Sequence, residues 1–168
     1  MSTRAQVAVA AVVAVVSAIG IGIIAVRWLS NDDHASKPIG LREAAAVSPF
    51  AGYREVRVEI GSHCVRVVVA DTETRRERGL RGASDLGPYA GMLFVQPGDS
   101  NIAFTMAGVT DPLEIAWFAA DGSRIATRHM RPCPGGGRDC PLYRSPRPYR
   151  SALETPGGTA LPRQLAPC

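Results

Sequence analysis

The chain has 168 residues, which is room for one domain of ordinary size once any targeting segment is set aside. Its 19 Lys and Arg residues outnumber its 15 Asp and Glu residues, and the basic excess is spread along the chain. Nucleic-acid-binding proteins gather basic residues on one face, so this pattern argues against a nucleic-acid partner.

The first 29 residues predict a membrane anchor. Residues 7–26 carry no charge and are apolar on every helical face. A helix of that length, at ~1.5 Å per residue, spans the ~30 Å hydrocarbon core of a bilayer. A cleaved signal peptide is the alternative, but its apolar core usually covers only about 7–15 residues. We interpret 1–29 as a signal-anchor that contacts the bilayer through 7–26, although the flanking basic residues do not fix its orientation.

Four cysteines follow this segment: Cys64, Cys133, Cys140 and Cys168. An even number of cysteines behind an export-like segment predicts disulfides and an oxidising compartment. Cys133 and Cys140 flank a flexible Gly-rich loop, and we expect them to form a bridge worth about 2–3 kcal/mol by loop closure. Cys64 and Cys168 either bridge the domain to its C-terminus or stay free, with Cys64 as a small buried apolar residue.

Residues 30–52 are interrupted by Asp, Ser and Pro, which predicts a juxtamembrane linker with one helical turn around 41–46. We expect the folded domain to cover 53–168. It opens with apolar alternation over 56–60, a Gly61-Ser62 turn and a buried strand over 64–70, a pattern typical of a β-hairpin.

One short helix is expected next, capped by Asp71 or Thr72 and ended by Gly79. A turn over 96–99 and an Asp121-Gly122 hairpin separate apolar segments typical of strands. The further predicted strands cover 91–95, 102–106, 113–119, 124–130 and 149–154. This series predicts a mainly β fold, a compact sandwich or barrel-like domain with one short helix.

The sequence lacks the common cofactor and nucleophile motifs, namely a phosphate-binding Gly loop, a G-x-S-x-G elbow and an H-E-x-x-H helix. A zinc site of His129, Cys133 and Cys140 is the one metal alternative. The spacing of the two cysteines is wide for zinc, and an oxidising compartment favours the bridge. We therefore expect no metal and no cofactor.

Two carboxylates stand in otherwise apolar strands, Glu114 in P-L-E-I-A-W and Glu154 at the end of Y-R-S-A-L-E. A buried acid must find a partner or change its pKa, because desolvation of its charge is costly. If both point inward, they form acid–base machinery with Arg78, His129 or Tyr143. The alternatives are a structural ion pair, or an outward Glu114 with Trp117 in the core.

A series of short motifs carries a family resemblance. Between Val56 and Gly158 the chain resembles the bacterial family known as domain of unknown function 192. The motifs are R-x-R-G-L at Arg76–Leu80, G-M-L-F-V at Gly91–Val95, F-T-M at Phe104–Met106, P-L-E-I at Pro112–Ile115, D-G at Asp121-Gly122, M-R-P-C before Pro134, C-P-L-Y-R-S-P at Cys140–Pro146 and Y-R-S-A-L-E at Tyr149–Glu154.

The resemblance implies a compact, mostly β domain that is often exported or lipid-anchored and has no settled activity. It places five residues at signature positions. These are the candidate catalytic residues Glu114 and Tyr143 and the candidate ligand-binding residues Arg78, Met106 and Glu154. The chain departs from the pattern after Phe104, where Thr105 replaces a Trp and residues 107–109 replace an Asn-Thr pair.

Three functions remain open at this point. The first is a binding or accessory module of the cell envelope, on the outer face of the cell membrane, that recognises a small ligand, an envelope polymer or a membrane protein. The second is a hydrolase-type enzyme that uses Glu114 with Tyr143 or Arg78. The third is a structural envelope protein.

Overall fold

The computed structural model describes residues 40–135, 137 and 139–168. The predicted signal-anchor, with its apolar segment 7–26, lies outside these residues. Within the described part of the chain, no helix combines the length and the hydropathy that a membrane crossing requires.

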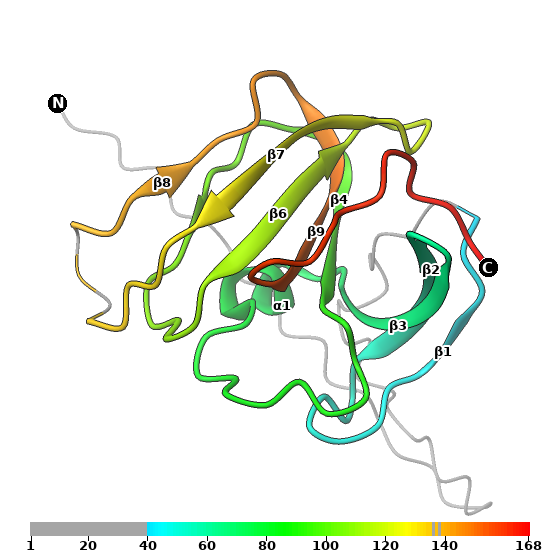
Figure 1. The fold of residues 1–168 in the computed structure, drawn as a ribbon, viewed down its shortest axis with the longest axis horizontal. Helices are drawn as coiled ribbons and strands as arrows, with labels where there is room; N and C mark the ends of the chain where they lie inside the picture. The colour runs from blue at the N-terminus through cyan, green and yellow to red at the C-terminus, as the bar shows by residue number, and fades with distance from the viewer. Residues whose placement is uncertain (1–39, 136, 138) are drawn as a thin grey trace, which may run out of the picture. The chain divides into compact units, whose positions relative to one another are not determined.

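The described chain is mainly β, as predicted, and is built on one seven-stranded sheet (Figure 1). The strand order is β1-β2-β3-β4-β9-β6-β7, and only β3 and β4 pair in parallel. β5 (Phe104–Thr105) and β8 (Leu142–Tyr143) form a separate two-stranded sheet. The large sheet contains β1 (Glu43–Ala45), β2 (Arg54–Ile60), β3 (His63–Ala70), β4 (Met92–Ser100), β6 (Leu113–Phe118), β7 (Arg124–Met130) and β9 (Tyr149–Pro156).

The only helix among the described residues, α1 (Glu73–Arg78), lies in the connection between the parallel strands β3 and β4. Parallel strands require such a crossover. The Thr72 hydroxyl accepts a hydrogen bond from the Arg75 backbone N–H at 3.3 Å, which caps the first turn. Gly79, at φ 52°, ends the helix. The predicted helix and its two end signals are therefore confirmed.

Most predicted strands are present within one or two residues, including the β2–β3 hairpin around Gly61-Ser62. Two local predictions are wrong. The expected helical turn at 41–46 is instead strand β1, which pairs with β2, and Leu41 and Phe50 are buried. The folded part therefore begins before the expected start at residue 53.

The expected turn at 96–99 continues β4, where a register shift between Val95 and Ser100 accommodates a proline.

Successive residues of the central strands face two different cores. Val68, Met92 and Trp117 belong to one hydrophobic cluster, together with Phe104 and Met106. The residues beside them in sequence, such as Val67, Leu93 and Ala116, belong to a second cluster with Leu165 from the C-terminal segment. A sheet buried on both faces explains why these strands read as continuous apolar runs.

Both pairs of cysteines form disulfides, Cys64 with Cys168 and Cys133 with Cys140. The first bond joins β3 to the last residue, which settles the alternative of free thiols at these positions. The second closes the loop after β7. The backbone N–H of Cys133 donates to the carbonyl of Val109 at 3.0 Å, and its carbonyl accepts from Gly108 at 2.9 Å. This disulfide therefore fixes the loop that holds residues 106–109.

The two disulfides close chain segments of different length, which predicts different contributions to stability. On the loop-closure model the Cys64–Cys168 bond, with a separation of 104 residues, contributes about 4–5 kcal/mol, and the Cys133–Cys140 bond, with a separation of 7, about 2–3 kcal/mol. We expect Cys64→Ala/Cys168→Ala to lower the urea midpoint more than Cys133→Ala/Cys140→Ala, followed by fluorescence of the buried Trp117. The opposite order would contradict the loop-closure account.

Candidate functional site

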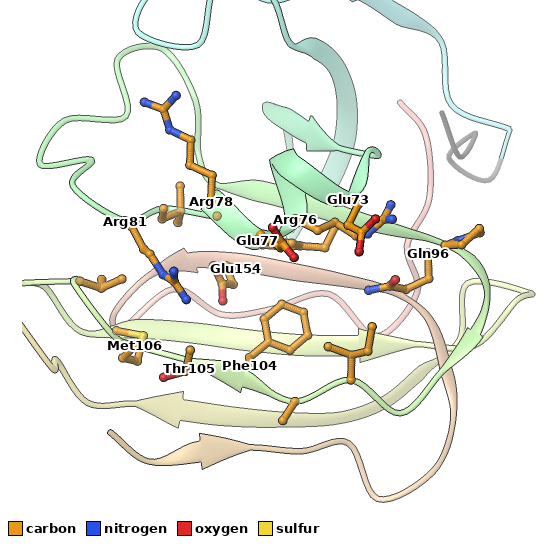
Figure 2. Close-up of a pocket in the computed structure, with 17 residues that line it drawn as sticks. Glu73, Arg76, Glu77, Arg78, Arg81, Gln96, Phe104, Thr105, Met106 and Glu154 are labelled. Carbon is orange, nitrogen blue, oxygen red and sulfur yellow. The ribbon is translucent and has the colours of Figure 1, made fainter. Parts of the chain in front are cut away.

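A cavity of about 720 Å³ opens on the Phe104 side of the large sheet, next to α1 (Figure 2). Pockets of this volume are typical of small-molecule sites. Its walls come from α1 and the loop after it, from β4, from residues 102–109 and from β9. The lining residues are Glu73, Arg76, Glu77, Arg78, Gly79, Leu80, Arg81, Phe94, Gln96, Pro97, Ile102, Ala103, Phe104, Thr105, Met106, Val109 and Glu154.

The floor of the cavity contains the carboxyl group of Glu154, whose side chain lies between α1 and Phe104 (Figure 2). Glu154 belongs to β9, and its partners across the sheet are Met92 on β4 and Ile115 on β6, both fully buried. Glu154 itself is 4% exposed. Burial among these apolar neighbours raises the pKa of the Glu154 carboxyl to about 8, so the group is mostly protonated at neutral pH.

No described residue donates a hydrogen bond to Glu154 or forms an ion pair with it, and this distinguishes Glu154 from the other buried acids. Asp71 is fully buried, and its carboxylate accepts hydrogen bonds from Arg54 Nε at 2.8 Å and from Arg75 Nη1 at 2.7 Å. Burial alone would raise the pKa of Asp71, but these two arginines lower it overall. Buried acids usually have such partners, so the isolation of Glu154 marks it as a candidate functional group.

Glu55 follows the same rule as Asp71. Its carboxylate accepts from Arg66 Nε at 2.9 Å and from the Tyr89 hydroxyl at 2.8 Å. The hydrogen bond from Arg66 is the main reason that the pKa of Glu55 is lowered. The chain therefore supplies partners to two of these three buried carboxyl groups and leaves the third open toward a cavity.

The arginines that line the cavity differ in how they are held. Arg76 Nη1 donates to the backbone carbonyls of Asp71 at 2.7 Å and Val95 at 2.9 Å, so its guanidinium is fixed to the scaffold. The side chains of Arg78 and Arg81 make no hydrogen bond to any described residue. In Figure 2 the Arg81 guanidinium is turned toward the part of the cavity that holds Glu154, whereas that of Arg78 is turned away.

The apolar wall is held by aromatic contacts. The rings of Phe94 and Phe104 meet edge to face with their centroids 5.1 Å apart. Phe104 also contacts Trp117 and Tyr149, at centroid distances of 6.2 and 6.0 Å. Met106, 1% exposed, completes this wall. These contacts connect the cavity to the core and keep its shape.

Two glycines of the family motifs allow the cavity to form. The turn at Gly79 directs Leu80 into the core, where it is 4% exposed, and leaves Arg81 exposed at the cavity. A Cβ on Gly91 would lie 2.0 Å from the Glu154 carbonyl oxygen. Only glycine therefore permits the chain that enters β4 to pass so close to Glu154.

The structure places three of the five candidate site residues in the cavity, namely Arg78, Met106 and Glu154. Glu114 and Tyr143 do not line it. Glu114 Oε1 lies 2.8 Å from His129 Nδ1 and accepts the Gly158 N–H at 3.3 Å. The Tyr143 hydroxyl accepts the backbone N–H of Arg131 at 2.9 Å. The structure thus does not bring Glu114 into the cavity with Arg78.

The sequence alone did not single out Arg81, Phe94, Gln96 or Phe104 as cavity residues. The family motifs taken together could have indicated these residues, because four of the motifs contribute side chains to the cavity. R-x-R-G-L supplies Arg76 to Leu80, G-M-L-F-V supplies Phe94, F-T-M supplies Phe104 to Met106, and Y-R-S-A-L-E supplies Glu154. Thr105, which stands in place of a Trp, is one of the wall residues.

The donors available to a metal are few. Within residues 40–135, 137 and 139–168 no group of three His, Cys, Asp or Glu side chains is arranged to hold a metal ion. Cys133 and Cys140 form a disulfide, and His129 lies beside Glu114.

The chain belongs to the family of domain of unknown function 192, described as "Uncharacterized ACR", which it matches over residues 56–167. This confirms the resemblance found in the sequence. A protein of unknown function from Novosphingobium aromaticivorans is similar in structure, with a TM-score of 0.58, 25% identity and coverage of 73% of this chain and 88% of that chain.

A putative transcription regulator from Sinorhizobium meliloti is also similar, with a TM-score of 0.52, 25% identity and coverage of 62% of this chain and 80% of that chain. No match was found among curated proteins. The family and the fold are therefore established, and neither assigns an activity to this chain.

The raised pKa of Glu154 predicts a pH dependence of stability. The carboxyl ionises near its ordinary pKa of 4.5 in the unfolded chain and near 8 in the folded protein. Between these values the folded state holds a proton that the unfolded state has lost. The free energy of unfolding therefore falls as pH rises, by at most about 1.4 kcal/mol per unit, and levels off above pH 8.

Urea unfolding from pH 5 to pH 9 tests this expectation. Glu154→Gln should remove the fall between pH 5 and pH 8, while Glu114→Gln, at a half-buried acid outside the cavity, should retain it. Asp71 and Glu55 do not disturb the comparison, because their lowered pKa values affect stability only below their ordinary range. An identical slope in wild type and Glu154→Gln would contradict the prediction.

Proposed function

We propose that this protein is a membrane-anchored, extracytoplasmic binding module of the cell envelope that holds a small ligand in the Glu154 cavity. The observation that carries the proposal is the unpartnered carboxyl group of Glu154, 4% exposed, at the floor of a 720 Å³ cavity. A buried acid without a partner destabilises the fold. A ligand that pairs with this carboxyl would explain why the fold contains a buried acid without a partner of its own.

The proposed location has separate support. Two disulfides without a free cysteine among the described residues suit an oxidising compartment. The uncharged stretch 7–26 has the length and composition of a membrane-spanning helix. A signal-anchor there, inserted with its C-terminal side outward, would place residues 40–168 outside the cell membrane, where an envelope component or a solute is the available ligand.

A catalytic role is the second candidate, and one observation favours it. A carboxyl group with a pKa of about 8 in a cavity is suited to act as a general acid near neutral pH. In this version Glu154 replaces Glu114 as the reactive carboxyl. Turnover of a bound compound, abolished in Glu154→Gln, would distinguish an enzyme from a binding module.

A variant that fills the cavity tests the binding function. Ala103 is half-buried on the cavity wall, so Ala103→Phe places a ring in the space available to a ligand. The full chain in detergent would be incubated with a small-molecule extract of the envelope and examined by native mass spectrometry. We expect wild type and the control Ala44→Phe, on exposed β1, to retain a ligand mass that Ala103→Phe loses. Retention by neither wild type nor control, or equal retention by all three, would refute the proposal.

The location is tested on cells that produce the full chain. We expect the protein in the membrane fraction with an intact N-terminus by mass, and no alkylation of Cys64, Cys133, Cys140 or Cys168 before reduction. Alkylation of all four without reduction would place the domain in a reducing compartment and contradict the proposed location.

A further inference from the structure

The chemistry of the cavity also indicates what kind of ligand it takes. We infer that the ligand is a small amino-acid-like zwitterion. Its protonated amine pairs with Glu154, its acidic group pairs with Arg81, and its apolar body packs on Phe94, Phe104 and Met106. This inference rests on the proposed binding function and deepens it.

The amine is assigned from the floor of the cavity. Glu154 lacks a donor from any described residue, and its neighbours across the sheet, Met92 and Ile115, cannot supply one. An ammonium group offers three donors together with the charge that a buried carboxylate requires. The rings of Phe94 and Phe104 line the same cavity, and aromatic faces attract organic cations.

Two other partners for Glu154 fit the surroundings less well. Ca²⁺ and Mg²⁺ require six or more oxygen ligands, and although Glu73 and Glu77 also line the cavity, no three acidic side chains of the described residues are grouped to hold a metal ion. A sugar or polyol would bury several hydroxyl groups against the apolar wall, where they would lack hydrogen-bond partners. An apolar body with one amine avoids both costs.

The acidic group is assigned from the mouth of the cavity. Arg81 is exposed there, its side chain makes no hydrogen bond to any described residue, and its guanidinium is turned toward the Glu154 part of the cavity (Figure 2). Arg76 also lines the cavity but donates to two backbone carbonyls. Arg81 is therefore the guanidinium placed for a ligand carboxylate, which it can bind through two parallel hydrogen bonds.

A single ligand has to pair with both Glu154 at the floor of the cavity and Arg81 at its mouth. A ligand with only an acidic group would leave Glu154 unpartnered beneath it and would bring a second acid toward a buried carboxyl. A ligand with only an amine would leave Arg81 without a contact. A zwitterion with an apolar side chain matches the carboxyl at the floor, the guanidinium at the mouth and the aromatic wall between them.

Binding of the amine requires Glu154 to ionise, and this gives the inference a measurable signature. The other charged groups that line the cavity are Glu73, Arg76, Glu77 and Arg78 on α1 and Arg81 after it, and Tyr149 interacts electrostatically with Glu154. Below pH 8 the free protein carries a proton on the Glu154 carboxyl, so ligand binding releases a proton to the solvent. The affinity should then rise by up to about tenfold per pH unit below pH 8 and level off above it. A ligand held by the protonated acid would show the opposite trend.

Three probes that share one aromatic body test the assignment. Phenylalanine carries both charged groups, 2-phenylethylamine only the amine, and 3-phenylpropanoate only the acid. Their binding to the full chain in detergent would be measured by titration calorimetry at pH 6, 7 and 8, in buffers of different ionisation enthalpy to count protons. We expect phenylalanine to bind most tightly and 3-phenylpropanoate most weakly, with the affinity for phenylalanine rising about tenfold from pH 6 to pH 7.

Substitutions of Glu154 and Arg81 test the contacts of the amine and of the acidic group separately. Glu154→Gln should weaken phenylalanine and 2-phenylethylamine at least tenfold at pH 8 and abolish proton release. Arg81→Gln should weaken phenylalanine and leave 2-phenylethylamine unchanged. The matched controls are Glu114→Gln, beside His129, and Arg131→Gln, exposed outside the cavity, and neither should change any affinity.

Tighter binding of 3-phenylpropanoate than of 2-phenylethylamine, or an unchanged phenylalanine affinity in Glu154→Gln, would overturn the inference. Binding of none of the three probes would also overturn it. The Ala103→Phe experiment then distinguishes failure of this ligand assignment from failure of the binding function. If wild type retains an extracted ligand that Ala103→Phe loses, the binding function stands and only the ligand class is wrong. If wild type retains no ligand, both the binding function and the ligand class are refuted.

Discussion

The structure is organised around one costly feature, a carboxyl group buried in the middle of a sheet. Glu154 lies on the interior strand β9, with a fully buried apolar residue on each side of it. Little of its surface is exposed, and no described side chain donates a hydrogen bond to it or pairs with its charge. The other buried acids, Asp71 and Glu55, show that this chain places arginines beside carboxylates where it buries them. The exception therefore lies at a cavity, where a ligand can take the place of an arginine.

The rest of the fold shapes the space above this group. The sheet is buried on both faces, so its central strands are held by two hydrophobic clusters. The crossover between β3 and β4 brings α1 to the cavity, and the turn at Gly79 sets the direction in which the chain leaves the helix toward Arg81. Segments far apart in sequence thus contribute the floor, the wall and the mouth of one site.

Sequence patterns predicted those parts of the fold that depend on local chemistry. The β2–β3 hairpin follows from apolar alternation around Gly61, and α1 follows from its cap at Thr72 and its stop at Gly79. Strand β1 was missed because its three residues, Glu43–Ala45, have a helical composition, and pairing with β2 decides their conformation. Spacing could not separate Glu154 from Glu114 either, because the register across three strands determines which of them faces the cavity.

The Cys133–Cys140 disulfide has a consequence for how the site matures. Cys133 is bonded through its backbone to the segment that carries Met106 and Val109, and β8, just after Cys140, pairs with β5 at Phe104. Oxidation of this pair therefore orders one wall of the cavity from both directions. A chain whose thiols are still reduced lacks this clamp, so this wall of the cavity is held less firmly before oxidation. The shape of the cavity therefore depends on the oxidation state of its surroundings.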